Sequence, residues 1–175
     1  MDGIFGWLGE HGAHQDLIRH MAKAARLSPA SALDSQASPA FGVAGASRFG
    51  KAGLHVEDGL AVACFGRPRF DDAELAATAR ARSPAAALAQ GWRRLGEQLP
   101  RHVQGNFAFA VLEPSTGQAF LALDRMGAER LCYAKRGGQF VFGTSVQGVA
   151  AHPAVGRSID TQAIYDYLYF HAIPA

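Results

Sequence analysis

The residues of this chain that could do chemistry are few and dispersed. Its seven histidines are scattered, and only His11 and His14 lie close together. The chain has no C-x-x-C or H-E-x-x-H segment of the kind that binds zinc. It also lacks the G-x-x-x-x-G-K-[ST] and G-x-G-x-x-G loops that bind nucleotide phosphates. The sequence therefore predicts neither a metal site nor a cofactor site within its 175 residues.

The two cysteines, Cys64 and Cys132, both lie in apolar runs. Two cysteines do not make a disulfide framework, so we expect buried free thiols. The N-terminus lacks the basic segment and apolar stretch of a signal peptide. No run approaches the ~18 consecutive apolar residues of a membrane span. These features predict a cytoplasmic protein that has no membrane partner.

The composition is that of one soluble globular domain. Hydrophobic residues make up 49% of the chain and charged residues 18%, which is enough apolar material for a core. A net charge of +2 is too small to predict nucleic-acid binding. One local excess of positive charge forms either solvated helix faces or a phosphate-binding patch. It consists of Arg80, Arg82, Arg93, Arg94 and Arg101.

The first half of the chain mixes strands and helices. Residues 3–7 form an apolar run typical of a buried strand, and Leu17, Met21 and Ala24 recur at helical spacing within 14–26. Residues 28–39, rich in Ser, Ala and Pro, favour a loop. Glycines interrupt a strand pattern over 41–56, and a clearer strand follows at 60–65.

Two helices follow these strands. Asp71 or Asp72 is suited to cap a helix that runs to about residue 81. Ser83 and Pro84 then provide a cap and a first helical residue. The second helix carries apolar residues at helical spacing, namely Leu88, Trp92, Leu95 and Leu99.

The second half turns to hairpins. Residues 105–113 are apolar on both alternating faces, so this strand should be covered on both sides. A turn at 114–117 joins it to a strand over 118–123, and a second hairpin links 131–135 to 139–143. Ser145 and Asp160 are suited to cap two final helices. Because hairpin strands are antiparallel and both sheet faces need cover, we expect an α+β fold of two antiparallel sheets between outer helices.

Several ordered segments resemble one family. The chain opens with Met-Asp-Gly-Ile-Phe-Gly, and residues 105–110 (GNFAFA) precede Leu-Asp-Arg-Met-Gly at 123–127. Further matching segments lie at 131–134, 142–145, 152–153, 159–160 and 167–175. Together they resemble the N-terminal class II glutamine amidotransferase domain of asparagine synthetase B-type enzymes. The resemblance implies an N-terminal-nucleophile hydrolase fold, which is a four-layer αββα sandwich, and a single domain over 1–175.

Glutaminase chemistry in that family needs a cysteine nucleophile with a free α-amino base, oxyanion donors, and charged groups that hold the substrate. The cysteine position is occupied here by Asp2, whose carboxylate is a poor nucleophile toward an amide. Aspartate also disfavours removal of Met1, which would leave no free amino base on residue 2. Alternatively, Asp2 is simply a polar residue at a strand edge.

The positions that resemble the oxyanion and substrate sites also depart from the family pattern. The family's N-G-E-I-Y-N segment matches 65–70, where Gly66 keeps a backbone N–H and Phe65 has no donor side chain. Arg67 and Arg69 either bind an anion or flank an exposed turn. Pro84 lies where the family's substrate-binding carboxylate is expected, within residues 82–85. Arg48 is the one arginine near the position of the substrate-binding arginine.

The adjacent Asp124 and Arg125 suggest a catalytic ion pair or, as we expect, a structural pair at a strand end. The pyrophosphate loop S-G-G-x-D-S of the family's synthetase domain is absent from this chain. ATP and Mg²⁺ are therefore expected only through a synthetase domain acting in cis or in trans, and the chain is also a candidate homo-oligomer.

Three functions remain open from the sequence. We expect a degenerate, inactive glutaminase-like domain of an amide-forming ligase, with a structural or partner role. The first alternative is a working, ammonia-donating amidotransferase domain. The second is a standalone module that binds a ligand or a peptide in the old cleft.

Overall fold

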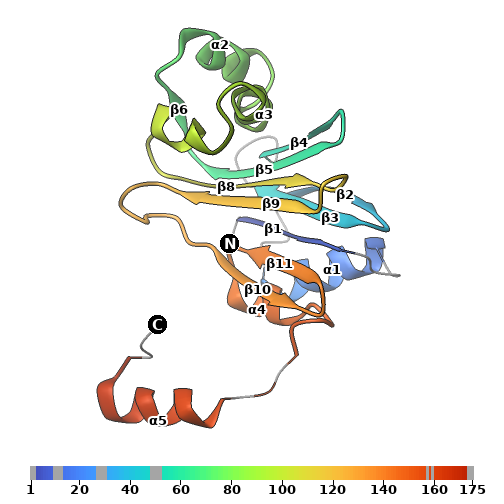
Figure 1. The fold of residues 1–175 in the computed structure, drawn as a ribbon, viewed down its shortest axis with the longest axis vertical. Helices are drawn as coiled ribbons and strands as arrows, with labels where there is room; N and C mark the ends of the chain where they lie inside the picture. Colours follow the sequence, from blue (N-terminus) through green and yellow to red (C-terminus); the bar gives the residue numbers. More distant parts are fainter. Residues whose placement is uncertain are drawn as a thin grey trace.

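The computed structural model describes residues 3–9, 14–26, 31–47, 53–156, 158 and 160–172, and it shows four stacked layers (Figure 1). A four-stranded sheet in the order β4-β5-β8-β9 packs on a five-stranded sheet in the order β10-β11-β1-β3-β2. Helices cover the outer face of each sheet. The expected αββα sandwich of antiparallel strands is confirmed.

The strands of the chain, of which β6 and β7 form a separate two-stranded sheet, are β1 (Gly3–Leu8), β2 (Ala32–Ser38), β3 (Phe41–Ser47), β4 (Gly53–Glu57), β5 (Leu60–Gly66), β6 (Arg69–Phe70), β7 (Val103–Gln104), β8 (Phe107–Glu113), β9 (Gln118–Leu123), β10 (Cys132–Arg136) and β11 (Gln139–Gly143).

Helices α2 (Ala73–Ala81) and α3 (Pro84–Leu95) form one outer layer, and α1 (His14–Ala24) and α4 (Val146–Ala150) form the other. The caps expected from the sequence are present. The side chains of Asp72, Ser83, Ser145 and Asp160 each accept a hydrogen bond from a backbone N–H in the first turn of their helix. The helix expected to reach Leu99 ends at Leu95, and a 3₁₀ helix, η1 (Gly96–His102), continues from it.

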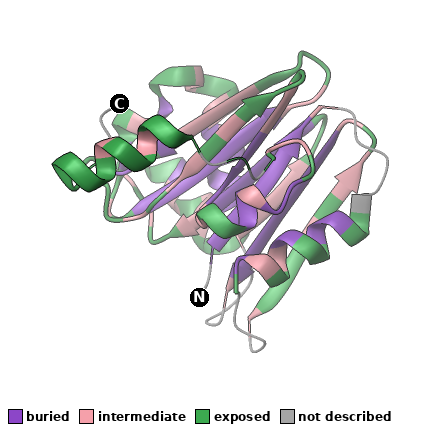
Figure 2. Cartoon of the chain, turned by 90° about the horizontal axis from the view of Figure 1, so that it is seen from below, coloured by how far each residue is buried: buried purple, intermediate pink, exposed green. Residues whose placement is uncertain are grey.

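Strand β8 shows why a sheet apolar on both faces needs two covering layers. Phe107, Phe109 and Val111 pack in the cluster that includes Leu75 and Leu88 of the outer helices. Its alternate residues face the other sheet. Because side chains alternate along a strand, one sequence of apolar residues fills two separate cores. Figure 2 shows the same layering: the strands in the middle of the molecule are mostly buried (purple), and the outer helices carry exposed residues (green).

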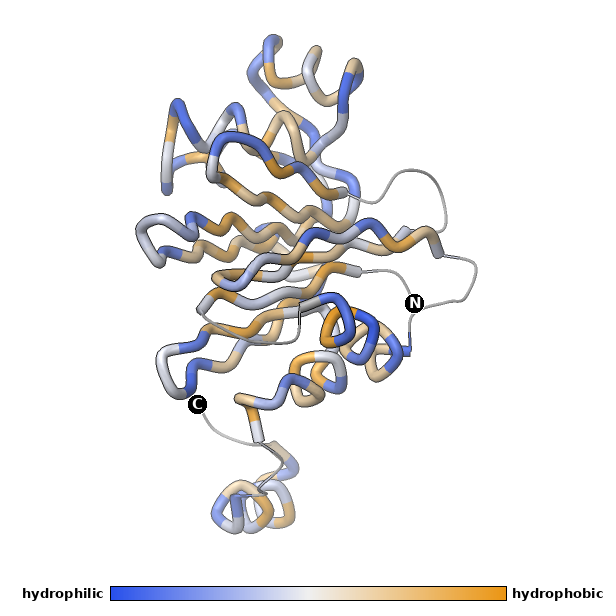
Figure 3. The backbone as a smooth tube through the Cα atoms, turned by 90° about the vertical axis from the view of Figure 1, so that its right-hand side faces the viewer, coloured by the Kyte–Doolittle hydropathy of each residue, from blue (hydrophilic) through white to orange (hydrophobic). Residues whose placement is uncertain are grey.

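The core between the sheets combines residues from the start and the end of the chain. Ile4, Val43 and Phe142 of one sheet meet Ala110 and Leu112 of the other. The colours of Figure 3 place hydrophobic residues along these central strands. Strand β1 is the third of five strands and all six of its residues are buried, as the apolar run predicted.

Strand β2 corrects the prediction of a loop over 28–39. Residues 32–38 form an edge strand that pairs antiparallel with β3, with Ala32 opposite Ser47 and Ser38 opposite Phe41. No β2 residue is fully buried, so its sequence carries no apolar alternation. Its pairing comes from the neighbouring β3 backbone, a tertiary effect that local propensity does not reveal.

The arginine-rich helices favour solvated faces over a phosphate-binding patch. Arg94 pairs with Asp72 at 3.0 Å and with Glu74 at 3.1 Å. Arg93 pairs with Asp58 at 3.4 Å, and Arg82 lies 3.6 Å from Glu57. Acidic partners thus neutralise three of the five cations.

Helix α5 (Thr161–Phe170) lies apart from the sandwich (Figure 1). None of its residues is buried, although most are apolar or aromatic. Its large exposed side chains are Ile164, Tyr165, Tyr167, Leu168, Tyr169 and Phe170. In the part of the chain that the structure describes, no helix is both long and apolar enough to cross a membrane.

Candidate functional site

Three of the sequence-predicted site residues meet at one cavity of about 950 Å³, which we call the cleft. Phe65 and Gly66 at the end of β5 and Pro84 at the start of α3 all line it. The cleft therefore lies where a strand end and a helix start converge beside the loop that precedes β8. Its size falls within the range of small-molecule sites.

The other two predicted site residues, Asp2 and Arg48, lie outside the described residues. Gly3, the first described residue, pairs with Ala46 in the sheet, and Ala46 lines the cleft. The N-terminal end of β1 is therefore hydrogen-bonded to a strand that borders the cleft. Along β4, the cleft is lined by Gly53, and the described positions 53–56 hold no arginine.

Gly66 has a backbone conformation that glycine alone adopts easily. Its φ is +99°, and a Cβ at this position would clash with the carbonyl oxygen of Asn106. The next residue, Arg67, donates its backbone N–H to that same oxygen at 2.6 Å. A structural need therefore explains this glycine, so its presence alone does not show an oxyanion donor.

Replacing Gly66 with alanine is expected to destabilise the domain by about 1–3 kcal/mol, since the change adds strain at positive φ and a clash with the Asn106 carbonyl oxygen. Chemical denaturation measures the free energy of unfolding. Gly117→Ala is the matched control, because Gly117 also has a positive φ of +69° but has open space around its Cβ position. Equal losses in the two variants would show that contact with Asn106 adds nothing.

Phe65 and Pro84 bring no polar side chain to the cleft. Phe65 is half-buried and packs beside the core between the sheets. Pro84 follows Ser83, whose hydroxyl oxygen accepts the N–H of Ala86 at 3.1 Å and is committed to capping α3. Residues 82–85 thus serve the helix start and present no carboxylate.

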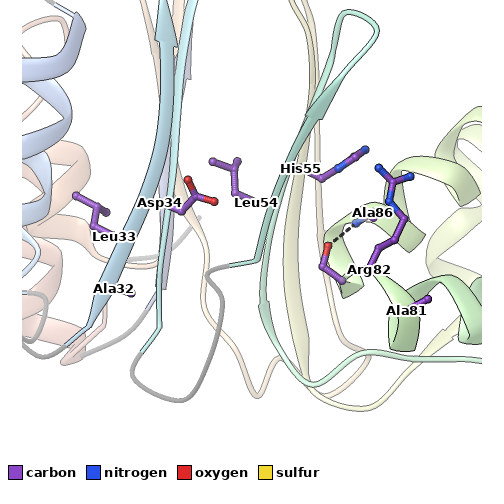
Figure 4. Close-up of a pocket in the computed structure, with 9 residues that line it drawn as sticks. Ala32, Leu33, Asp34, Leu54, His55, Ala81, Arg82 and Ala86 are labelled. Carbon is purple, nitrogen blue, oxygen red and sulfur yellow. Dashed lines mark hydrogen bonds between the residues drawn. The ribbon is translucent and has the colours of Figure 1, made fainter.

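A second cavity, of about 510 Å³, lies between β2, β4 and the start of α3 (Figure 4). Asp34 points from β2 toward Leu54 of β4, and His55 lies on the far side beside Arg82. The His55 Nε2 atom is 3.1 Å from Glu57, which also attracts Arg82. His55 and Arg82 of this cavity thus both lie beside the Glu57 carboxylate at the end of β4.

The cysteine in the cleft does not replace the lost nucleophile. Cys64 lines the cleft wall but is 6% exposed, and burial raises the pKa of its thiol to about 12. A thiol must ionise to attack an amide, and at neutral pH roughly 10⁻⁴ or less of this group is thiolate. Partial burial also raises the pKa of Cys132, whose side chain is half-buried and not fully buried as the sequence predicted.

We expect Cys64 to resist iodoacetamide in the folded protein at neutral pH, because both its burial and its raised pKa suppress reaction. Intact mass spectrometry of a Cys132→Ala variant isolates this thiol. The same variant in denaturant is the positive control and should be fully alkylated. Alkylation of the folded variant as fast as in denaturant would contradict the assignment.

Asp124 supports a loop and has no described ion pair with Arg125. Asp124 is 6% exposed, and its carboxylate accepts four backbone N–H groups. Burial raises the pKa of Asp124, but these hydrogen bonds outweigh it, so the pKa lies below its ordinary value. The structural role expected from the sequence holds, but the partners are backbone groups. The donors are Phe107 at 3.4 Å, Met126 at 3.0 Å, Ala128 at 3.1 Å and Glu129 at 3.2 Å.

This loop brings to the cleft a residue that the sequence did not single out. Glu129 lines the cleft, and desolvation together with the nearby Asp124 charge raises the pKa of its carboxyl group. Asn106 lines the cleft as well, and its place beside Gly105 in the GNFAFA segment was a usable signal. Nothing in the local sequence around Glu129 marks it as a residue of the cleft.

Among the described residues, no three His, Cys, Asp or Glu side chains are grouped to hold a metal ion.

Comparisons with known proteins agree with this architecture. The sequence pattern of a family described as "Glutamine amidotransferase domain" matches residues 69–175. The chain is also similar to asparagine synthetase [glutamine-hydrolyzing] 3 of Bacillus subtilis (strain 168), with 37% identity over 59 residues. That similarity covers 34% of this chain and 10% of the length of the relative.

Proposed function

Because this chain belongs to the glutamine amidotransferase domain family, we propose that it is a degenerate glutaminase-like domain of an asparagine synthetase-related, amide-forming ligase. The observation that carries the proposal is the chemistry of the cleft. Phe65 and Pro84 occupy it where the resemblance calls for a donor and a carboxylate. The thiol that it contains is protonated. The described lining of the cleft thus offers no ionised thiol, no donor side chain at residue 65 and no carboxylate at residues 82–85.

In this proposal the domain has a structural or partner role. A synthetase domain, in cis or in trans, supplies the ATP and Mg²⁺ chemistry. The exposed apolar side chains of α5 support a partner, because an apolar helix surface is normally covered. The relative named above is a glutamine-hydrolysing asparagine synthetase, which makes a ligase of that kind the parent we favour.

The alternative of a working amidotransferase domain draws on Gly66, which lines the cleft and retains a backbone N–H as a residual oxyanion donor. It would require another group to act as nucleophile in place of Asp2. Glutamate release from L-glutamine distinguishes this alternative from the main proposal.

The reading frame downstream of residue 175 tests the link to a ligase. We expect an S-G-G-x-D-S pyrophosphate loop there, or in a gene for a partner chain that copurifies with this one. Absence of the loop from both places would contradict the ligase assignment. It would favour a standalone module that uses the cleft for binding.

A further inference from the structure

We propose that the cleft binds a small monocarboxylate with an apolar body, and that Arg67 and Arg69 recognise its carboxylate. The inference rests on the proposed function, since a cleft without glutaminase chemistry is free to hold another ligand. Both arginines line the cleft, and both are exposed at its edge.

The backbone holds the two arginines in a fixed relation. They flank Pro68, whose ring restricts φ between them. The Arg67 N–H bonds to the Asn106 carbonyl, and Arg69 pairs with Gln104 across β6 and β7. Two guanidinium groups at the edge of one cleft suit a carboxylate, which accepts several charged hydrogen bonds.

No acidic side chain neutralises these two cations among the residues that the structure describes. Arg93 and Arg94, by contrast, each pair with aspartate or glutamate on neighbouring elements. Unpaired arginines at the edge of a cavity favour binding of an anion from outside the chain.

Beside the polar Ser47 and Asn106, the cleft has an uncharged, largely apolar part of its lining that suits an apolar body. Its described lining includes Ala46, Cys64, Phe65 and Pro84, none of which brings a charge. The Cys64 thiol is neutral at physiological pH because burial raises its pKa. Inorganic phosphate would contact the arginines but leave these apolar residues uncovered, so we expect it to bind more weakly.

Glu129 limits the charge of the ligand. It lies in the same cleft and is partly desolvated, so it repels a second negative group more strongly than an exposed carboxylate would. A ligand with one carboxylate avoids most of this repulsion. Removing the Glu129 charge should therefore strengthen carboxylate binding.

The proposal is tested by titrating the protein with hexanoate at low ionic strength and monitoring binding through the NMR chemical shifts of the protein. We expect hexanoate to bind at millimolar concentrations or below, with shifts at the cleft residues. Hexanamide, its neutral analogue, should bind at least about tenfold more weakly, and so should inorganic phosphate. No binding of hexanoate, or equal binding of the acid and the amide, would overturn the proposal.

Variants of the protein test whether the two arginines bind the carboxylate of hexanoate. The double variant Arg67→Gln, Arg69→Gln should lose at least about tenfold in hexanoate affinity, whereas Glu129→Gln should gain severalfold. Arg136→Gln, on β10 outside the cleft, is the matched control and should bind like the parent protein. Unchanged affinity in the double variant, or weaker binding in Glu129→Gln, would refute the assignment.

The binding result and the glutaminase result are separable. If hexanoate does not bind and no glutamate is released, the ligand proposal fails while the loss of glutaminase chemistry stands. Glutamate release with no hexanoate binding contradicts both proposals.

Discussion

Replacing Asp124 with asparagine is expected to lower the melting temperature by about 5–10 °C, because buried N–H donors would lose their acceptor. The carboxylate accepts two N–H groups on each oxygen. An asparagine keeps one oxygen and turns an amide N–H₂ toward the other pair. The variant should therefore also loosen the loop that holds Glu129 at the cleft, which amide hydrogen exchange can follow.

The stability supplied by Asp124 depends on pH in a defined direction. Its pKa is lower in the folded protein than in the unfolded chain, where aspartate titrates at about 3.9. Protons therefore bind the unfolded chain more readily, and stability rises with pH through this range. The contribution is complete above the unfolded pKa and is lost as pH falls through the folded-state value.

Thermal unfolding of the parent and the Asp124→Asn variant from neutral pH to below pH 4 tests this linkage. Their melting temperatures should converge at the acid end. Asp16→Asn is the control, because the Asp16 side chain is 90% exposed and pairs with the exposed Arg19. A melting temperature of Asp124→Asn equal to that of the control at neutral pH would show that the loop needs no carboxylate.

Restoring a cysteine at position 2 is expected not to restore glutamine hydrolysis. The Asp2→Cys variant regains a thiol and a residue small enough to permit removal of Met1. It still lacks the donor side chain at Phe65, and the loss of one oxyanion donor costs about 10²–10³ in rate. No carboxylate replaces Pro84 or its neighbours to hold the substrate.

Glutamate release by Asp2→Cys should therefore remain at the level of the boiled protein. Adding Phe65→Asn to this variant tests whether the missing oxyanion donor at residue 65 limits hydrolysis. If it does, the double variant should release glutamate faster than Asp2→Cys alone. Substantial hydrolysis by Asp2→Cys alone would mean that the cleft has retained its remaining machinery.

Local signals predicted much of this fold. The caps at Asp72, Ser83, Ser145 and Asp160 depend on residues within one helical turn, and all four are present. The two-sided apolar pattern of β8 correctly required two covering layers. These features need no knowledge of distant parts of the chain.

Long-range contacts explain what the sequence did not reveal. Strand β2 exists because β3 offers it a backbone partner, not because its own residues favour a strand. Glu129 reaches the cleft because Asp124 holds the intervening loop through backbone hydrogen bonds. Phe65, Gly66 and Pro84 were placed at one site by resemblance, and their convergence required the folded chain.

Glutamate production from L-glutamine by the purified chain, measured against a boiled sample, tests the loss of glutaminase chemistry most directly. We predict equal glutamate in the two samples at saturating glutamine and neutral pH. Glutamate released well above the boiled control, and abolished by Asp2→Ala, would show a working glutaminase and contradict the account.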